Sequence, residues 1–208
     1  MPNKLLAVVL SVGLASIGAG TARAEPLIVE LTVDADINPA TASYIGRGIR
    51  QADDRGAALL LIQLNTPGGQ MIAMRDITEQ MLRSPVPIGV WVGPLGARAA
   101  SAGTFIVYAA HVAGMAPSTT IGAAHPVLLG GMPGIEPGEP REEPANQLKT
   151  MEEKIVNDAV AQIQALALQR GRNAEWAARA VRESITSTAQ EALKLGVVDF
   201  VAASAEEF

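Results

Sequence analysis

Two glycine-centred turns, each placed directly after a run of apolar residues, constrain the fold of this chain more than any other feature. The first turn, residues 65–69, follows the apolar run 58–64, and the second, residues 99–104, follows residues 88–92. A run that is apolar at nearly every position is typical of a parallel strand covered on both faces. Two such turns side by side would place backbone N–H groups and one hydroxyl around a common point, as acyl-transfer chemistry requires.

Patterns typical of strands and helices alternate along the rest of the chain. The strand patterns lie at residues 27–33, 58–64, 88–92, 112–116 and 197–201. The helix patterns lie at residues 40–54, 71–82, 100–110, 151–169, 173–182 and 188–196, with a turn at 117–120 and a loop at 122–126. Asn173 is a candidate N-cap, and Thr188 with Glu191 forms a capping-box pattern. This alternation predicts an α/β domain with a largely parallel sheet and right-handed crossover helices.

Composition narrows the classes of partner and cofactor. The 208 residues suffice for one domain with a full core, and the net charge of -5 disfavours nucleic acid as a partner. The chain has no cysteine, which excludes disulfides and thiolate metal sites, and its two histidines are too few for a His-rich metal site. We therefore expect no metal and no cofactor.

The N-terminal residues have the pattern of a secretory signal peptide. Lys4 precedes an apolar run at residues 5–20, and the small residues Ala22 and Ala24 fit a cleavage site after Ala24. We therefore expect a signal peptide at residues 1–24, a mature domain at 25–208, and a location in the periplasm or on the extracytoplasmic face of the membrane. The alternative is an uncleaved N-terminal anchor, which would associate the protein with the membrane.

A segment rich in glycine, proline and acidic residues interrupts the regular patterns. It begins at His125 and runs to Pro144, and we expect a flexible loop over residues 124–148. A long loop next to a candidate site is often a lid, so it is predicted to order over a bound peptide.

Ser101 is the candidate nucleophile. The sequence Ala-Ala-Ser-Ala-Gly around it resembles a nucleophile elbow, in which small flanking residues such as Gly103 let the hydroxyl stand clear of a tight turn. The alternative is a serine that only caps the helix. The turn Pro67-Gly68-Gly69 would let a backbone N–H approach a substrate oxygen, although Pro-Gly is also common in ordinary turns.

Together these motifs resemble the ClpP/crotonase fold, and within it the membrane-bound serine proteases of the NfeD family. The residues that carry the resemblance are Leu64 to Gly69, Ala99 to Thr104, Met115 to Pro117, Ile121 to Ala123, Gly171 to Asn173, and Glu191 to Leu193 with Gly196. The resemblance implies that Ser101 is the nucleophile and that the N–H groups of Gly69 and Ala102 form the oxyanion hole. It also implies a Ser-Lys dyad, whose lysine corresponds to Lys154 by its spacing from Gly171.

The residues themselves leave more than one candidate for the general base. A helical wheel places Lys154 with Asp158 on the side opposite the apolar face, so the alternative is a solvated lysine paired to Asp158. Lys149 is the second lysine candidate. His125 is the rival base, but no aspartate or glutamate stands out to orient its ring, and it could line the cleft without chemistry. His111 is expected to be structural.

The leading hypothesis is an extracytoplasmic serine endopeptidase. The resemblance implies apolar peptide as substrate, with the C-terminal region of a stomatin-like membrane protein as the partner, and a homodimer. The alternatives are a non-catalytic scaffold that binds a stomatin-like protein and a crotonase-like acyl-CoA enzyme, although a signal peptide disfavours a cytoplasmic cofactor.

Overall fold

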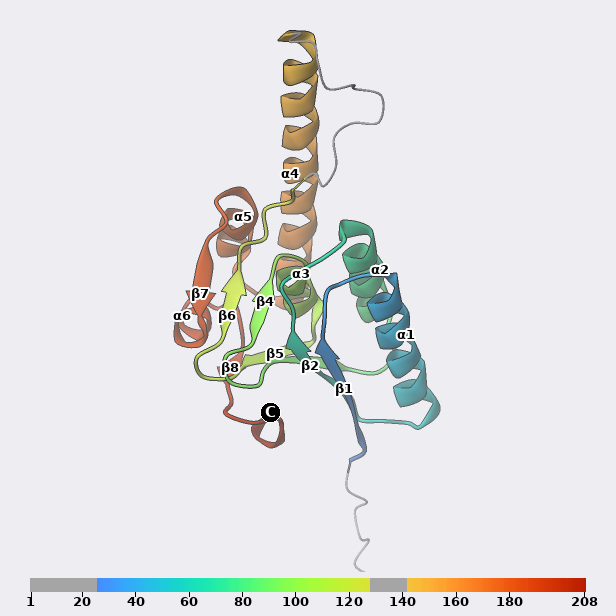
Figure 1. Ribbon diagram of the computed structural model, residues 1–208. Helices are drawn as coiled ribbons and strands as arrows, with labels where there is room; N and C mark the ends of the chain where they lie inside the picture. The colour runs from blue at the N-terminus through green and yellow to red at the C-terminus, as the bar shows by residue number, and fades with distance from the viewer. Residues whose placement is uncertain (1–25, 128–141) are drawn as a thin grey trace, which may run out of the picture.

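The structure of the protein is a computed structural model, which describes residues 26–127 and 142–208. Helices pack against a parallel sheet, so the predicted α/β class is confirmed (Figure 1). The strands of this sheet, in spatial order, are β1 (Ile28–Asp34), β2 (Leu59–Asn65), β3 (Ile88–Val92), β5 (Val112–Met115) and β8 (Phe200–Val201). Each strand runs parallel to its neighbours.

A second, small sheet lies beside the first and was not expected from the sequence. Its strands are β4 (Arg98–Ala100), β6 (Thr120–Gly122) and β7 (Thr186–Thr188), with β6 parallel to β4 and antiparallel to β7. The predicted turn and loop at residues 117–126 are therefore wrong for β6, and the predicted helix at residue 100 begins at Ala102 instead. Three-residue strands are too short to show a period of two, so tertiary pairing defines them.

Most helices begin and end close to where the sequence indicates. They are α1 (Pro39–Asp54), α2 (Met71–Leu82), α3 (Ala102–Ala109), α4 (Glu142–Arg170), α5 (Ala174–Arg182) and α6 (Ala189–Lys194), followed by the 3-10 turn η1 (Ala205–Glu207). The Asn173 side chain accepts a hydrogen bond from Trp176 N–H at the start of α5, and Thr188 and Glu191 form the predicted capping box. Local side-chain chemistry therefore sets these boundaries.

Helix α4 begins within the segment predicted as a loop. It starts at Glu142, so the loop prediction for residues 124–148 is wrong for residues 142–148. Pro144 falls in the first turn of the helix, where its missing N–H has no intrahelical partner to lose.

Residues 128–141 and the signal peptide expected at residues 1–24 lie outside the described residues. Within the described ranges, no helix combines the length and the apolar character needed to span a membrane.

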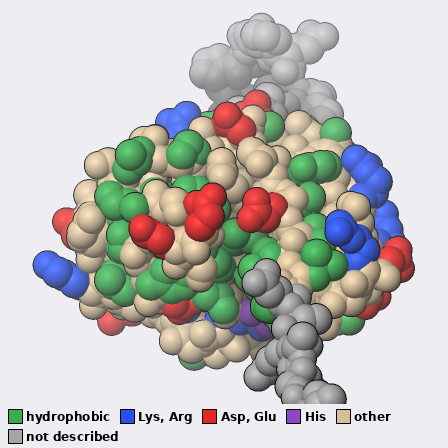
Figure 2. All heavy atoms as spheres, turned by 90° about the horizontal axis from the view of Figure 1, so that it is seen from below, with side chains coloured by type: hydrophobic (Ala, Val, Ile, Leu, Met, Phe, Trp, Pro, Cys, Tyr) green, Lys and Arg blue, Asp and Glu red, His purple; other side chains and the backbone are tan. Residues whose placement is uncertain are grey.

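The core lies mainly on the face of the large sheet that the helices cover. Every residue of α3 is buried, so this helix lies at the centre of the core. On the opposite face, Leu61, Trp91 and Ala116 form a smaller cluster against the C-terminal residue Phe208. On the face seen from below in Figure 2, hydrophobic side chains are interspersed with other atoms and with several acidic side chains.

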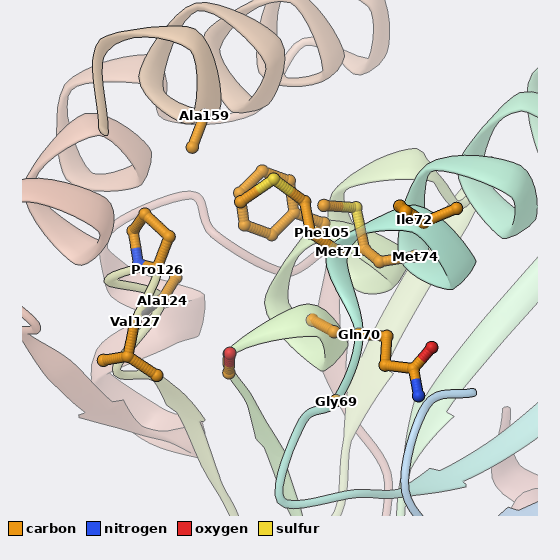
Figure 3. A pocket seen from close by; sticks show the side chains of 12 residues that line it. Gly69, Gln70, Met71, Ile72, Met74, Phe105, Ala124, Pro126, Val127 and Ala159 are labelled. Atoms are coloured by element: carbon orange, nitrogen blue, oxygen red, sulfur yellow. The ribbon is translucent and has the colours of Figure 1, made fainter. Parts of the chain in front are cut away.

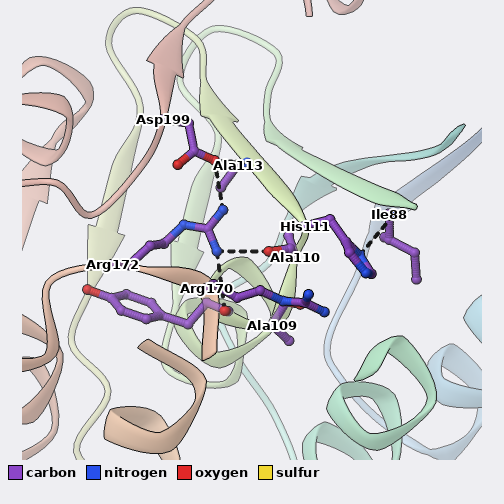
Figure 4. Close-up of polar contacts among 9 residues, drawn as sticks. Ile88, Ala109, Ala110, His111, Ala113, Arg170, Arg172 and Asp199 are labelled. Carbon is purple, nitrogen blue, oxygen red and sulfur yellow. Dashed lines mark hydrogen bonds and ion pairs between the residues drawn. The ribbon is translucent and has the colours of Figure 1, made fainter. Parts of the chain in front are cut away.

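The C-terminal end of α3 is held by Arg170, the last residue of α4, and by Arg172, which lies just after that helix (Figure 4). Arg172 Nη1 donates to the carbonyl of Ala110 at 2.8 Å, and its Nη2 lies 2.7 Å from the Asp199 carboxylate. Arg170 Nε donates to the carbonyl of Ala109 at 2.9 Å. The positive charges lie at the negative end of the helix dipole, and they satisfy carbonyls that the helix leaves unpaired.

The Arg172 ion pair predicts a large effect on stability. The Arg172 side chain is only 2% exposed, and its removal would leave the Ala110 carbonyl without this donor and the Asp199 carboxylate without its cation. We expect Arg172→Met to lower the free energy of unfolding by about 3 kcal/mol, measured by urea denaturation. Arg179→Met is the matched control, because Arg179 pairs with Glu183 at the surface and its loss costs less than about 1 kcal/mol. Equal losses in the two variants would contradict the structural role of Arg172.

His111 predicts a specific acid sensitivity. Its Nδ1 accepts a hydrogen bond from Ile88 N–H at 3.1 Å, and burial, followed by Arg170 and Arg172, lowers its pKa (Figure 4). Because the unfolded chain then takes up a proton at a higher pH than the folded chain, stability is retained above about pH 6.5 and falls below it. We expect His111→Asn, which keeps an acceptor but does not titrate, to lose less stability between pH 7.5 and 5.5 than the unmodified protein. Parallel unfolding curves for both proteins at the two pH values would refute this role.

Candidate active site

Ser101 lies in a strained turn between β4 and α3. Its backbone has φ of 53° and ψ of -116°, a region that side chains rarely adopt. The Ser101 side chain makes no capping hydrogen bond, which excludes the alternative of a simple N-cap serine. Among the described residues, none forms a hydrogen bond with the Ser101 hydroxyl. The turn therefore has the backbone geometry of a nucleophile elbow, with its hydroxyl available.

Hydrogen bonds to the small sheet hold this turn in place. Ser101 N–H donates to the carbonyl of Gly122 at 3.0 Å, at the end of β6. The buried Thr104 hydroxyl lies 3.0 Å from the same carbonyl and 3.1 Å from the carbonyl of Ala99. The pairing of β4 with β6 thus fixes the chain on both sides of Ser101, and the strain at Ser101 is offset by these contacts.

The glycine turn after β2 lies directly against the Ser101 turn. A Cβ atom on Gly68 would lie 2.5 Å from the Cβ of Ser101, so only glycine permits this approach. Gly69 has φ of 154°, and a Cβ atom there would lie 2.0 Å from the carbonyl oxygen of Ile37. The structure therefore brings together the two turns that the sequence predicts to meet, including Pro67 on the first turn and Gly103 on the second.

Two backbone N–H groups remain available beside Ser101. Gly69 forms a parallel β-bridge with Ile37, in which the two residues beside Gly69 make the hydrogen bonds. Ile37 N–H donates to the carbonyl of Gly68 at 2.7 Å, and Gln70 N–H donates to the carbonyl of Ile37 at 2.8 Å. In a parallel bridge of this kind, the N–H of the residue between the two bonded neighbours, here Gly69, points away from the partner strand. Ala102 is the first residue of α3, so its N–H has no acceptor within the helix. Neither N–H bonds to another described residue, and both residues line the same pocket as Ser101.

The pocket beside Ser101 has a volume of about 450 Å³ and mostly apolar walls (Figure 3). Figure 3 shows side chains of α2 on one side, the segment after β6 on the other, and Ala159 of α4 above. The apolar lining residues are Met71, Ile72, Met74, Phe105, Ala124, Pro126, Val127 and Ala159. Ile72 and Val127, at the rim, are 83% and 71% exposed. The sequence did not single out these side chains for binding, because helical spacing alone cannot distinguish a pocket wall from core.

The lysine candidates lie on α4 away from the pocket wall. Lys154 is exposed on the helix before Ala159, and it is not among the residues that line the Ser101 pocket. Asp158 pairs with Arg75 of α2, so the alternative of a Lys154 side chain paired to Asp158 is not observed. Lys149 lies in a separate pocket between α4 and α5. The described residues therefore do not bring Lys154 and Ser101 together.

His125 is not among the residues that line the Ser101 pocket. Its Nδ1 lies 2.8 Å from the carbonyl of Val181, which can only accept, so Nδ1 carries a proton. Its Nε2 lies 3.9 Å from the Glu152 carboxylate. The neighbouring residues Ala124 and Pro126 line the Ser101 pocket, whereas His125 lines the pocket between α4 and α5. His125 thus fixes the pocket wall from behind, and its placement does not suit the role of base for Ser101.

The structure offers no metal site among its described residues, since these contain no group of histidine, aspartate and glutamate side chains that could hold a metal ion.

The residue that the sequence analysis missed is Thr66. It is fully buried, and its hydroxyl accepts from Gly68 N–H at 3.1 Å. A single threonine between an apolar run and a glycine turn was the available signal.

Comparison of the sequence with known proteins relates this chain to one protein family. The family model described as "NfeD1b, N-terminal domain" matches residues 27–208. The chain is 35% identical over 185 residues to the membrane-bound protease PH1510 of Pyrococcus horikoshii, covering 88% of this chain and 39% of that protein. It is 31% identical over 94 residues to the membrane protein NfeD1b of Bacillus subtilis, covering 45% of this chain and 21% of that protein. The chain thus spans well under half the length of these relatives.

Solved structures agree with this grouping. A serine-to-alanine mutant of the 1510-N membrane-bound stomatin-specific protease superposes with a TM-score of 0.77 at 34% identity, covering 89% of this chain and 84% of that one. A lysine-to-alanine mutant of the same protease, in complex with a substrate peptide, superposes with a TM-score of 0.75 at 34% identity, covering 89% and 79%. These matches confirm the predicted ClpP/crotonase-like fold.

The strained backbone predicts a difference between two substitutions at one position. Ser101→Ala keeps the Cβ atom and the strain, whereas Ser101→Gly removes both and adds conformational freedom to the unfolded chain. Strain relief outweighs that entropy, so we expect Ser101→Gly to be more stable than Ser101→Ala by about 1 kcal/mol. Thermal and urea unfolding of the two variants provide the measurement. A glycine variant less stable than the alanine variant would mean that the turn is not strained.

Proposed function

Because the chain belongs to the NfeD1b N-terminal domain family, we propose that its folded domain is a serine endopeptidase that cleaves apolar peptide segments. The observation that carries this proposal is the elbow at Ser101, which lies beside two unpaired N–H groups in an apolar pocket. A relative of this chain is named as a protease, and a related structure is described as holding a substrate peptide.

The proposed reaction begins with attack of Ser101 Oγ on the scissile carbonyl carbon. Lys154 Nζ accepts the hydroxyl proton and later gives it to the leaving amine, and water then hydrolyses the acyl-enzyme. The N–H groups of Gly69 and Ala102 stabilise the oxyanion, at about 3 kcal/mol for each donor. Lys154 must approach Ser101 for the proton transfer, so peptide binding is proposed to bring the Lys154 turn of α4 toward the pocket.

The pocket walls support the choice of substrate. Met71, Met74 and Phe105 offer apolar surface, and the exposed Ile72 and Val127 extend it at the rim. Burying apolar side chains of a peptide there contributes about 25 cal/mol for each Å² removed from water. Since a related structure is described as a stomatin-specific protease, the proposed substrate is the C-terminal region of a stomatin-like protein. The proposal includes a homodimer, export by the N-terminal signal peptide, and action on the extracytoplasmic face of the membrane.

The test is cleavage of an internally quenched apolar peptide by the purified domain. We expect Ser101→Ala and Lys154→Ala each to lower kcat by at least about 10³-fold, because the nucleophile and its base act as a unit. Lys149→Ala is the matched control on the same helix, and it should retain activity. Mass spectrometry identifies the cleaved bond.

Three outcomes would reject or change parts of this proposal. Full activity in Ser101→Ala would exclude the serine protease. An inactive unmodified protein that still binds a stomatin-like peptide would favour the non-catalytic scaffold. Loss of activity in His125→Ala together with an active Lys154→Ala would assign the base to His125.

A further inference from the structure

The seam where α2 meets α4 adjoins the Ser101 pocket, because both helices contribute residues to the pocket wall. Arg75 of α2 forms an ion pair with Asp158 of α4, and Arg75 Nη2 also lies 3.7 Å from Met71 Sδ. Gln162 of α4 donates to Met74 Sδ at 3.8 Å. Met71 and Met74 both line the Ser101 pocket. The polar contacts of this seam therefore join the pocket wall to the helix that carries Lys154.

Asp158 lies one helical turn after Lys154 on α4. Side chains at this spacing are neighbours on a helix surface, so the Asp158 carboxylate is within reach of the Lys154 ammonium when it has no other partner. In the structure Asp158 is instead engaged by Arg75. No carboxylate among the described residues forms an ion pair with Lys154. Two cations thus compete for one carboxylate, and the arginine holds it.

We propose that Arg75 is a positioning residue that keeps Asp158 away from Lys154, so that the lysine amine can accept the proton of Ser101. This inference rests on the proposed function, in which Lys154 is the base. An ammonium that is paired to a carboxylate keeps its proton and cannot act as a base. Arginine suits this role because its guanidinium stays charged at every pH of interest and binds a carboxylate with a rigid set of donors.

Among the described residues, the other carboxylates near this turn form no ion pair with Lys154 either. On α2, Glu79 pairs with Arg83 at 2.6 Å. On the opposite side of α4, Glu152 and Glu153 line the pocket between α4 and α5, together with His125, Lys149 and Arg182. Helix α3 carries no charged residue. Asp158 is therefore the carboxylate whose availability Arg75 controls.

The experiment compares Arg75→Gln, Asp158→Asn and the double variant, with kcat and KM measured against pH on the apolar peptide. In Arg75→Gln, the freed Asp158 pairs with Lys154 and favours the ammonium. We expect the acid limb of the plot of kcat against pH to shift to higher pH by about one unit. At pH values on the acid side of this limb, kcat is then about tenfold lower, with little change in KM. Asp158→Asn should keep the unmodified profile, and the double variant should regain it.

This pattern distinguishes a positioning role of Arg75 from a role in which Arg75 only holds α2 and α4 together. If Arg75 only braced α4, Asp158→Asn would be as impaired as Arg75→Gln, and the double variant would not recover. Either result, or an unchanged acid limb in Arg75→Gln, overturns the inference. Folding is checked by thermal unfolding, which should change little because the Arg75 and Asp158 side chains are 43% and 62% exposed.

The controls also separate this inference from the proposed function. An inactive Lys154→Ala combined with the wrong pattern at Arg75 overturns the positioning role alone. A fully active Lys154→Ala overturns both the dyad and the positioning role. A readout independent of cleavage is NMR titration of ¹³C-labelled lysine in the Ser101→Ala background. There, Arg75→Gln should move the titration of the Lys154 signal to higher pH, and the added Asp158→Asn should reverse the change.

Discussion

The buried Thr66 is the constraint on which the candidate site depends, because it bonds to both turns at once. Its N–H donates to the carbonyl of Arg98 at 2.8 Å, and its carbonyl accepts from Ala100 N–H at 3.1 Å. Its hydroxyl accepts from the N–H of Gly68. A Cβ atom on Gly103 would lie 2.6 Å from the Thr66 methyl, so α3 begins in direct contact with this residue. The backbone and side chain of this one residue thus hold the glycine turn and the serine turn together.

Helix α3 connects this site to the opposite end of the core. Its N-terminus carries the available N–H of Ala102 beside Ser101, and its C-terminal carbonyls are bonded by Arg170 and Arg172. A buried arginine is unfavourable unless its charge is compensated, and Asp199 supplies the compensation. Asp199 also accepts from the Ala113 N–H of β5 at 2.7 Å. The helix that presents the serine is therefore fixed at both ends by polar groups, in a core that is otherwise apolar.

Sequence patterns predicted what local chemistry determines and missed what distant pairing determines. The bounds of α2 and the caps Asn173 and Thr188 follow from neighbouring residues, so they could be predicted closely. The two turns could be predicted to meet because both follow parallel strands. Strands β4, β6 and β7 could not, since each depends on partners far along the chain. Likewise, the helical wheel paired Asp158 with Lys154, whereas α2 supplies Arg75 as a partner that no local pattern reveals.

The backbone of Ser101 links chemistry to the completion of folding. Its conformation is unfavourable in isolation, and the contacts that enforce it come from β6, Thr66 and Thr104. A chain still emerging or only partly collapsed has no means to hold that turn, so it possesses the serine without the reactive arrangement. The reactive arrangement of Ser101 therefore forms together with these tertiary contacts and is lost with them, so under the proposed function an unfolded chain would not cleave peptides.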